Sequence, residues 1–425
     1  MHPSTNRRRL LALLGAGSVP LLVRPALAAV SAQTDVPEQD FTGPGANPYW
    51  NSVGPYVSYP QKLPLLRLTD RPIQLETPRQ YFREVFTPNA AFFVRYHLPQ
   101  APNAVDLAAW RLRLEGNFDR PLDLSFEQLI REFKPVSVAA VNQCSGNSRS
   151  RLQPRVAGGQ WGNGAMGNAQ WTGVRLHEVL ERGGVRKGTV QLQFEGLDHG
   201  VGALDKPEAR FLKSVDVGDP MLDKAVIAYL MNGEALPMLN GFPVRLIVPG
   251  KFATYWTKHL SFIRALTKPD ANFWMNPAYR IPLTPGGDTT PQAVAAGQVR
   301  MQPIGAVDMP VRSFIVDPDG SAPLVRGLPT LIRGVAFSGQ GRVTRVEVST
   351  DDGRSWQQAT LGDDHGAYSF RSYSHVWTPP QAGRHTLAVR ATDSSGHTQT
   401  EHGVWNPGGY LWNRIERQDV VVLSA

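Results

Sequence analysis

The sequence predicts an α+β protein, in which a mixed α/β domain is followed by an immunoglobulin-like β-sandwich. Three observations support this fold class. The 425 residues include 40 glycines and 35 prolines, too many for a mainly helical protein. From about residue 80 to 285, patterns typical of strands and of short helices alternate. After about residue 285 the pattern is purely β, at the strand spacing of a sandwich.

The first 28 residues have the pattern of an export signal. Arg7–Arg9 precede an apolar stretch, Leu10–Val23, and Ala26–Ala28 form an A-x-A cleavage site. The arginines fit a twin-arginine signal, and a plain secretory signal is the alternative. We therefore expect export by the twin-arginine route to the periplasm. The apolar stretch is too short to predict a membrane span.

The remaining chain divides into four segments by composition. Residues 29–62 form an arm rich in Pro, Gly, Asn and Ser, with scattered aromatic side chains. Residues 63–285 form the mixed domain, 286–300 a linker and 301–425 the sandwich. Formal net charge is +8, and the signal segment carries four arginines, so no basic tract of the nucleic-acid-binding kind remains.

The elements of the mixed domain follow from apolar spacing. Strands are expected at Ala91–His97, around Trp110–Leu114, and at Val136–Val141, Ala225–Met231 and Phe242–Val248. Helices are expected after a Ser125/Gln128 capping box, with Phe126, Leu129, Ile130 and Phe133 on one face, and at Arg175–Arg182 before Gly183. In the sandwich, alternation over 343–349, an Asp352-Gly353 turn and a strand at Thr386–Ala391 are expected.

The chain has one cysteine, Cys144. One cysteine excludes an internal disulfide framework, a four-cysteine zinc site, an iron–sulfur cluster held by this chain alone and a covalently attached c-type haem. Cys144 follows the Val136–Val141 strand and precedes small, turn-prone residues, with Arg149 five positions later. From these facts alone a buried structural thiol and a reactive or metal-binding thiol both remain open.

Six blocks in order then resemble the molybdenum-binding core of the sulfite oxidase family, and the β-sandwich that follows resembles the dimerisation domain of that family. The six blocks are Phe92–Pro99, Gln143–Arg149, Gly164–Val174, Phe194–Asp198, Met231–Gly233 and Gly241–Gly250. Within this family, the blocks together with Tyr255–Leu260 and Phe273–Arg280 are similar to the catalytic molybdopterin subunit of bacterial periplasmic sulfite dehydrogenases. The resemblance makes 63–285 a molybdopterin-binding catalytic domain and 301–425 a dimerisation-type domain.

The resemblance implies a molybdenum–molybdopterin cofactor, with Cys144 as the single protein ligand of the metal. A soft thiolate suits a metal already bound by the sulfurs of a pterin dithiolene. Arg95, His97, Arg149 and Tyr279 match catalytic, substrate-pocket positions. The implied cofactor-binding residues are Phe93, Val94, Arg95, Tyr96, His97, Asp198, Asn240, Arg245, Trp256, Thr257 and Lys258.

The implied reaction is oxidation of sulfite to sulfate, with electrons passed singly to a c-type cytochrome, as a subunit or a soluble acceptor. No haem is expected in this chain, and the C-terminal domain is expected to form a homodimer or to dock a partner subunit. Three positions depart from the animal enzymes. Gly408 stands at an arginine position, Asn240 at a histidine position and Tyr255 at another arginine position.

Two other classes of function compete with this prediction. The first is a sister enzyme on the same fold, a sulfane dehydrogenase or a nitrate-reductase-like enzyme. The arginine and tyrosine pocket favours sulfite, and the export signal argues against assimilatory nitrate reduction. The second is a secreted β-rich binding protein in which the cysteine is structural.

Overall fold

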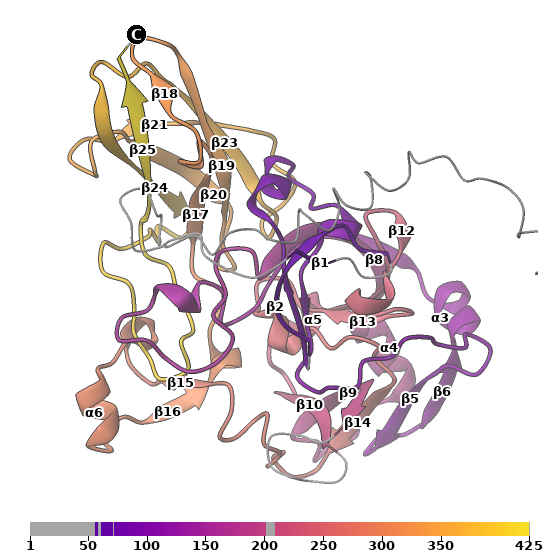
Figure 1. The fold of residues 1–425 in the computed structure, drawn as a ribbon. Coiled ribbons are helices and arrows are strands. Elements are labelled where there is room, and N and C mark those ends of the chain that lie inside the picture. Colours follow the sequence, from indigo (N-terminus) through magenta and orange to yellow (C-terminus); the bar gives the residue numbers. More distant parts are fainter. Residues whose placement is uncertain (1–55, 58–60, 71, 201–208, 425) are drawn as a thin grey trace, which may run out of the picture. The chain divides into compact units, whose positions relative to one another are not determined.

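The computed structural model describes residues 56–57, 61–70, 72–200 and 209–424, which all belong to one compact unit, residues 41–425 (Figure 1). The predicted export signal, 1–28, and most of the predicted arm, 29–62, lie outside the described residues. Among the described residues, no helix is long and apolar enough to cross a membrane.

Three sheets build the first part of the fold, and most of their strand pairs are antiparallel. A four-stranded sheet has the order β1 (Tyr56–Val57), β2 (Leu65–Asp70), β3 (Ile73–Glu76) and β4 (Val94–Arg95). A five-stranded sheet has the order β10 (Ala209–Asp216), β9 (Gln191–Gly200), β14 (Phe262–Leu266), β5 (Arg111–Gly116) and β6 (Leu122–Ser125). In the third, β12 (Glu234–Ala235), β11 (Val226–Met231), β8 (Met166–Arg175) and β7 (Pro135–Gln143) follow one another, and β13 (Arg245–Ile247) also pairs with β11.

Helices are few and short in the described part of the chain. The α-helices are α3 (Phe126–Glu132), α4 (Leu176–Gly183), α5 (Met221–Lys224) and α6 (Pro291–Ala295). Single 3₁₀ turns connect the strands: η1 (Arg79–Arg83), η2 (Asn89–Ala91), η3 (Arg149–Arg151), η4 (Met238–Asn240), η5 (Ala253–Tyr255), η6 (Pro285–Gly287) and η7 (Ile304–Ala306).

A two-stranded pair, β15 (Arg280–Pro282) with β16 (Met301–Pro303), precedes two sheets that form the β-sandwich. One sheet has the order β17 (Arg312–Asp317), β19 (Thr330–Phe337), β23 (Arg371–Trp377) and β22 (Thr360–Leu361). The other has the order β18 (Leu324–Val325), β25 (Glu416–Leu423), β24 (Gly383–Asp393), β20 (Val343–Ser349) and β21 (Gln357–Gln358). Their inner faces enclose an apolar core that includes Ile332, Val346 and Leu387, all 0% exposed. The α+β class with a C-terminal sandwich is confirmed.

Two predicted strands are shorter than expected. In Ala91–His97 only Val94 and Arg95 pair with β3, and Ala91 belongs to η2. Residues 91–94 are all buried, so this stretch packs into the core on every side instead of alternating as a surface strand does. The strand expected over 242–248 is reduced to Arg245–Ile247, because Pro243 has no backbone N–H to donate to a ladder.

The capping box that begins α3 is confirmed. The Ser125 hydroxyl accepts from the Gln128 N–H at 3.1 Å, and the Gln128 side-chain oxygen accepts from the Ser125 N–H at 3.0 Å. Leu129 and Phe133 are buried as expected, but Ile130 is 38% exposed. The buried stripe is therefore narrower than the spacing predicts.

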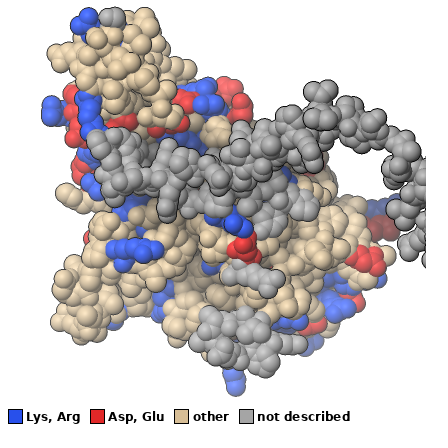
Figure 2. Space-filling model, viewed as in Figure 1, with Lys and Arg blue, Asp and Glu red and all other residues tan. Residues whose placement is uncertain are grey.

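One face of the molecule carries surface charges of both signs. On the face in Figure 2, Lys and Arg residues are interspersed with Asp and Glu residues and separated by uncharged ones. The concentration of positive charge that bears on function lies inside the protein, in the pocket described next.

Candidate active site

Cys144 lies directly after β7, on a loop that is held by backbone hydrogen bonds. Its N–H donates to the Ala165 carbonyl at 2.9 Å, and its carbonyl accepts from the Asn147 N–H at 3.0 Å. The Asn147 side chain in turn accepts from the Ala165 N–H at 3.0 Å. The cysteine is 8% exposed, and it lines a pocket. The strand end therefore presents a single thiol in a fixed position.

That pocket encloses about 570 Å³ of empty space, its mouth included, within the usual range for a small-molecule site. Most of the residues that the sequence singled out meet there although they are far apart in the chain. Those that line it are Phe93, Arg95, His97, Cys144, Asp198, Asn240, Arg245, Trp256, Thr257, Lys258 and Tyr279.

Two predicted cofactor-binding side chains lie behind the pocket wall. Val94 and Tyr96 belong to a small apolar cluster with Leu65 and Leu75, and both are at most 1% exposed. The Tyr96 hydroxyl makes a 2.7 Å hydrogen bond with His259 Nε2. A pocket contact from these two positions would have to use the backbone, because their side chains support the wall from behind.

Arg149 does not line the pocket itself but lies next to it. Its Nε and Nη2 donate to the Gly408 carbonyl at 3.2 and 3.0 Å, and its guanidinium lies 5.4 Å from the Tyr410 ring centroid. Tyr410 stacks on Tyr279 with centroids 5.7 Å apart. The backbone at position 408 thus binds Arg149 where the resemblance places an arginine in animal enzymes.

His97 and Tyr279 form a hydrogen-bonded pair between His97 Nε2 and the Tyr279 hydroxyl. The imidazole stacks on Phe211 with centroids 3.8 Å apart and meets the edge of Trp274. Burial, followed by the charges of Arg95, Lys258 and Lys213, holds the pKa of His97 well below its usual value. His97 is therefore neutral near pH 7, and burial also raises the pKa of Tyr279.

Three cations and one acid line the same pocket. Lys258 Nζ donates to the Arg95 carbonyl at 2.6 Å, and Arg245 donates to the carbonyls of Asn240 and Trp256 at 2.9 and 3.2 Å. Burial lowers the pKa of Lys258 to about 7, against the attraction of Asp198, and lowers that of Arg245 to about 9. Burial raises the pKa of Asp198. An anionic group bound in the pocket would stabilise the charged forms of Lys258 and Arg245 and so raise their pKa values.

The donor set fits the molybdenum–pterin group that the resemblance implies. Four buried polar atoms of pocket residues have no hydrogen-bond partner among the residues that the structure describes, namely Asn142 Nδ2, Arg245 Nε, Thr254 Oγ1 and Thr257 Oγ1. A buried polar group without a partner costs free energy, and a polar ligand in this pocket would satisfy these four atoms. A thiol for a soft metal, cations for a phosphate and a carboxyl for pterin amines complete the match.

Sequence reasoning missed two buried lysines beside this pocket. Lys62 Nζ donates to the carbonyls of Asn89 and Phe92 at 2.8 and 3.0 Å and to the Asn240 side chain. Burial, with the nearby Arg245, lowers the pKa of Lys62 to about 7. Lys213 lies against the Tyr279 ring. Neither lysine belongs to a recognisable motif, and lysines are mostly exposed, so no sequence signal marked them.

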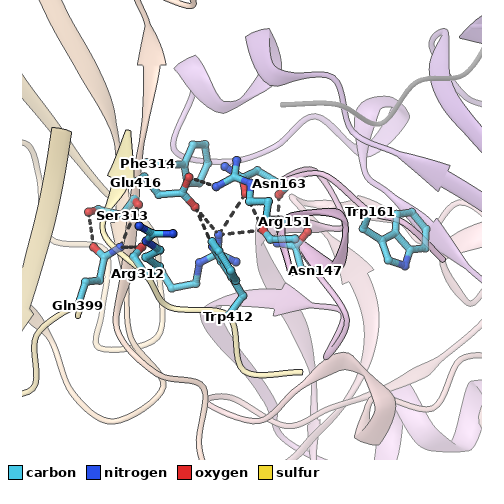
Figure 3. A network of polar contacts seen from close by, with 12 residues as sticks. Asn147, Arg151, Trp161, Asn163, Arg312, Ser313, Phe314, Gln399, Trp412 and Glu416 are labelled. Atoms are coloured by element: carbon cyan, nitrogen blue, oxygen red, sulfur yellow. Dashed lines mark hydrogen bonds and ion pairs between the residues drawn. The ribbon is translucent and has the colours of Figure 1, made fainter. Parts of the chain in front are cut away.

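A buried ionic network joins the sandwich to the loop that carries Cys144 (Figure 3). Arg312 on β17 donates to the Gln143 side chain at 3.1 Å, to Ser148 at 3.1 Å and to Glu416 on β25 at 2.9 Å. Glu416 also pairs with Arg151 of η3. Gln143 immediately precedes Cys144, so residues of the C-terminal sandwich help to fix the thiol loop.

Comparison with known proteins agrees with a molybdopterin-binding pocket and a C-terminal dimerisation-type domain. Residues 97–274 match the oxidoreductase molybdopterin binding domain, and residues 304–422 match the Mo-co oxidoreductase dimerisation domain. The chain is 32% identical to the mitochondrial sulfite oxidase of Rattus norvegicus over 86% of this chain and 68% of that protein. It is 33% identical to the sulfite oxidase of Gallus gallus over 85% of this chain and 79% of that protein.

Two further similar proteins carry the names of other enzymes. An NADH nitrate reductase of Solanum lycopersicum is 30% identical over 83% of this chain and 41% of that protein. The structure of the sulfane dehydrogenase SoxCD from Paracoccus pantotrophus superposes with a TM-score of 0.70, at 25% identity, over 87% of this chain and 90% of that chain. The chain is therefore a molybdenum oxidoreductase that belongs to the sulfite oxidase family.

Proposed function

We propose that this protein oxidises sulfite to sulfate at a molybdenum–pterin centre and passes the electrons singly to a c-type cytochrome. The observation that carries the proposal is the single thiol of Cys144 in one pocket with Arg95, His97 and Tyr279. Family membership favours an enzyme over the alternative of a β-rich binding protein.

Different residues of the pocket would bind different parts of the molybdenum–pterin group. Cys144 would bind the metal, Arg245 and Lys258 the phosphate, and Asp198 the amino groups of the pterin. The unpartnered Thr257 hydroxyl and Asn142 amide would donate or accept further hydrogen bonds. When bound, this group supplies the two-electron redox chemistry.

The residues on the substrate side suit a small oxyanion. Arg95 supplies fixed positive charge, and its planar guanidinium matches the oxygens of sulfite. The Tyr279 hydroxyl, oriented by neutral His97, is placed to hold a hydrogen bond to the substrate and to move a proton. Conversion of sulfite and water to sulfate releases two protons and two electrons, so a proton acceptor and an electron acceptor are both required.

The remaining parts of the proposal concern location and partners. The predicted twin-arginine signal supports a periplasmic enzyme, since that route exports folded proteins that already contain a cofactor. A c-type cytochrome, as a subunit or as a soluble protein, would accept the electrons. The match of residues 304–422 to a dimerisation domain supports a homodimer through the sandwich.

A sulfane dehydrogenase activity is the second candidate. It is favoured by the superposition on SoxCD, which spans most of both chains. The two candidates differ in the reduced sulfur compound that they accept, so one assay with both compounds separates them.

The test is a sulfite assay with ferricytochrome c on protein whose molybdenum has been quantified. Wild-type protein from a molybdenum-replete host should contain about one molybdenum per chain and reduce cytochrome c when sulfite is added. Cys144→Ser should lose roughly hundredfold or more of this activity and most of the metal, with an unchanged circular dichroism spectrum. Wild-type protein that holds no molybdenum, or a fully active Cys144→Ser variant, would overturn the proposal.

A further inference from the structure

Strand β10 carries a lysine, Lys213, whose side chain is buried behind the candidate active site. Lys213 is 1% exposed. Its ammonium donates a hydrogen bond to the Trp274 carbonyl at 2.7 Å. It lies 4.8 Å from the ring centroid of Tyr279 and 4.7 Å from that of Tyr255. The cation therefore adjoins the tyrosine that forms one wall of the pocket.

Strand β10 holds the loop that leads to Tyr279 at several points. The Arg210 carbonyl accepts from the Trp274 indole at 2.9 Å, and the Ser214 hydroxyl donates to Asp270 at 2.6 Å. The bond from Lys213 to the Trp274 carbonyl lies between these two contacts. Lys213 thus fixes the loop five residues before Tyr279.

The ammonium of Lys213 is buried at a cost that its surroundings do not offset. Within the part of the chain that the structure describes, its Nζ contacts the Trp274 carbonyl and the rings of Tyr255 and Tyr279 and forms no ion pair with a carboxylate. Burial lowers the pKa of Lys213 to about 7, and the distant Asp270 opposes this shift only in part. A methionine of similar length would fill the same space without a charge, so packing alone does not require a lysine.

Tyr279 needs such support, because its backbone is strained. Its φ is 56°, in the left-handed region that residues with a side chain seldom adopt. A conformation of this kind persists only where the surrounding contacts hold it. The Lys213 ammonium, His97 and the stacked Tyr410 all contact the Tyr279 side chain.

We infer that Lys213 is a positioning residue of this active site, which holds the Tyr279 loop and places a positive charge against the Tyr279 ring. The inference goes beyond the proposed reaction, and its kinetic test rests on that function. Lys213 acts through Tyr279 and does not touch the pocket, since it is not among the residues that line it.

The charge of Lys213 makes this action depend on pH. The groups that face its ammonium are the rings of Tyr255 and Tyr279 and the Trp274 carbonyl, with Asp270 and His97 further away. With a pKa of about 7, the lysine is charged at pH 6 and neutral at pH 9. The charge-dependent part of the Lys213 contribution should therefore be present at pH 6 and absent at pH 9, where the neutral amine still donates to the Trp274 carbonyl.

The first experiment is kinetic and uses the holoenzyme. Lys213→Met should lower kcat/KM for sulfite at pH 6 by about tenfold, within the range for a misplaced catalytic group, and should lower it by a clearly smaller factor at pH 9. In a Tyr279→Phe background the same substitution should have little effect on kcat/KM, because the Tyr279 hydroxyl that Lys213 positions is absent. Lys213→Arg keeps the charge and should restore most of the loss. Equal losses in both backgrounds, or no loss at pH 6, would overturn the inference.

The second experiment does not depend on turnover, so it separates this inference from the proposed function. In protein labelled with ¹³C at tyrosine Cζ, the Tyr279 resonance, assigned with Tyr279→Phe, should titrate near pH 7 in wild type and lose this step in Lys213→Met. If the Tyr279 resonance of Lys213→Met still titrates near pH 7, the charge of Lys213 does not act on Tyr279 and the inference is wrong. If Lys213→Met loses the step but the wild-type protein does not oxidise sulfite, the positioning role of Lys213 is supported and only the proposed substrate is rejected.

Thermal unfolding distinguishes this role from a merely structural one. A buried lysine whose folded-state pKa is about 7, against 10.5 when unfolded, costs stability below pH 10 and most below pH 7. Lys213→Met should therefore unfold at pH 6 at the same or a higher temperature than wild type. A Tm several degrees lower would indicate a structural lysine. The control is Lys224→Met, an exposed lysine 5.4 Å from the Tyr368 ring, which should leave the kinetics unchanged.

Discussion

The position of the Arg149 side chain depends on the absence of a side chain at Gly146. The Arg149 guanidinium lies where a side chain at Gly146 would stand, since a Cβ there would meet its Nη2 at 2.3 Å. The same guanidinium binds the Gly408 carbonyl and adjoins Tyr410. The run Cys144–Arg149 is therefore one unit, in which Gly146 leaves room for the arginine five residues after the thiol.

A substitution at Gly146 tests this arrangement. Gly146→Ala should displace the guanidinium of Arg149 from the Gly408 carbonyl and from Tyr410, which stacks on Tyr279 at the pocket wall. We expect KM for sulfite to rise by about tenfold, the value of one hydrogen bond made by a charged group. Steady-state kinetics across sulfite concentrations measures the change. In an Arg149→Met background, Gly146→Ala should add little, and a full second effect there would show that the alanine acts by another route.

Single elements of this protein are specified locally where a side chain caps or interrupts the backbone. The Ser125/Gln128 box begins α3, and Gly184, with φ of 68°, ends α4. Both ends follow from short-range chemistry, so the sequence predicts them well. The strand at 91–97 was predicted too long because its burial depends on distant segments that surround it.

The capping box makes a prediction at this scale. Ser125→Ala removes the hydroxyl that accepts from the Gln128 N–H and should destabilise the protein by about 1 kcal/mol. Thermal unfolding detects the loss, and activity should not change, because α3 lies outside the pocket. Arg131→Ala on the same helix removes only an exposed pair with Glu127 and should cost at most about 0.5 kcal/mol. Equal effects of the two variants would contradict the role of the cap.

The whole molecule depends on contacts between the sandwich and the Cys144 loop. Arg312 is fully buried and is held by Gln143, Ser148, Asn163 and Glu416. The C-terminal domain is thus connected to the residue before the thiol, whatever it does in dimerisation.

Removal of the Arg312 side chain should therefore destabilise both the sandwich and the loop that carries Cys144. Arg312→Met leaves Glu416 with Arg151 as its remaining charged partner in this network, and loss of one member of a buried ion pair costs about 3–5 kcal/mol. We expect a lower Tm and a smaller molybdenum content per chain. Arg345→Met removes an exposed arginine of the same sandwich from Glu347, which keeps its pair with Arg390, and should cost about 1 kcal/mol or less. If both variants unfold at the wild-type temperature, the network does not stabilise the junction.

The sequence by itself determined the fold class, the single thiol and the family, because ordered motifs and local turn chemistry survive without knowledge of distant contacts. It also named most of the residues that line the pocket. Only the tertiary structure decided that Val94 and Tyr96 turn away from it, that Arg149 binds the carbonyl at 408, and that Lys62, Lys213 and the Arg312 network support the site. The physical reason is that burial and charge at each of these positions are set by segments that are remote in sequence.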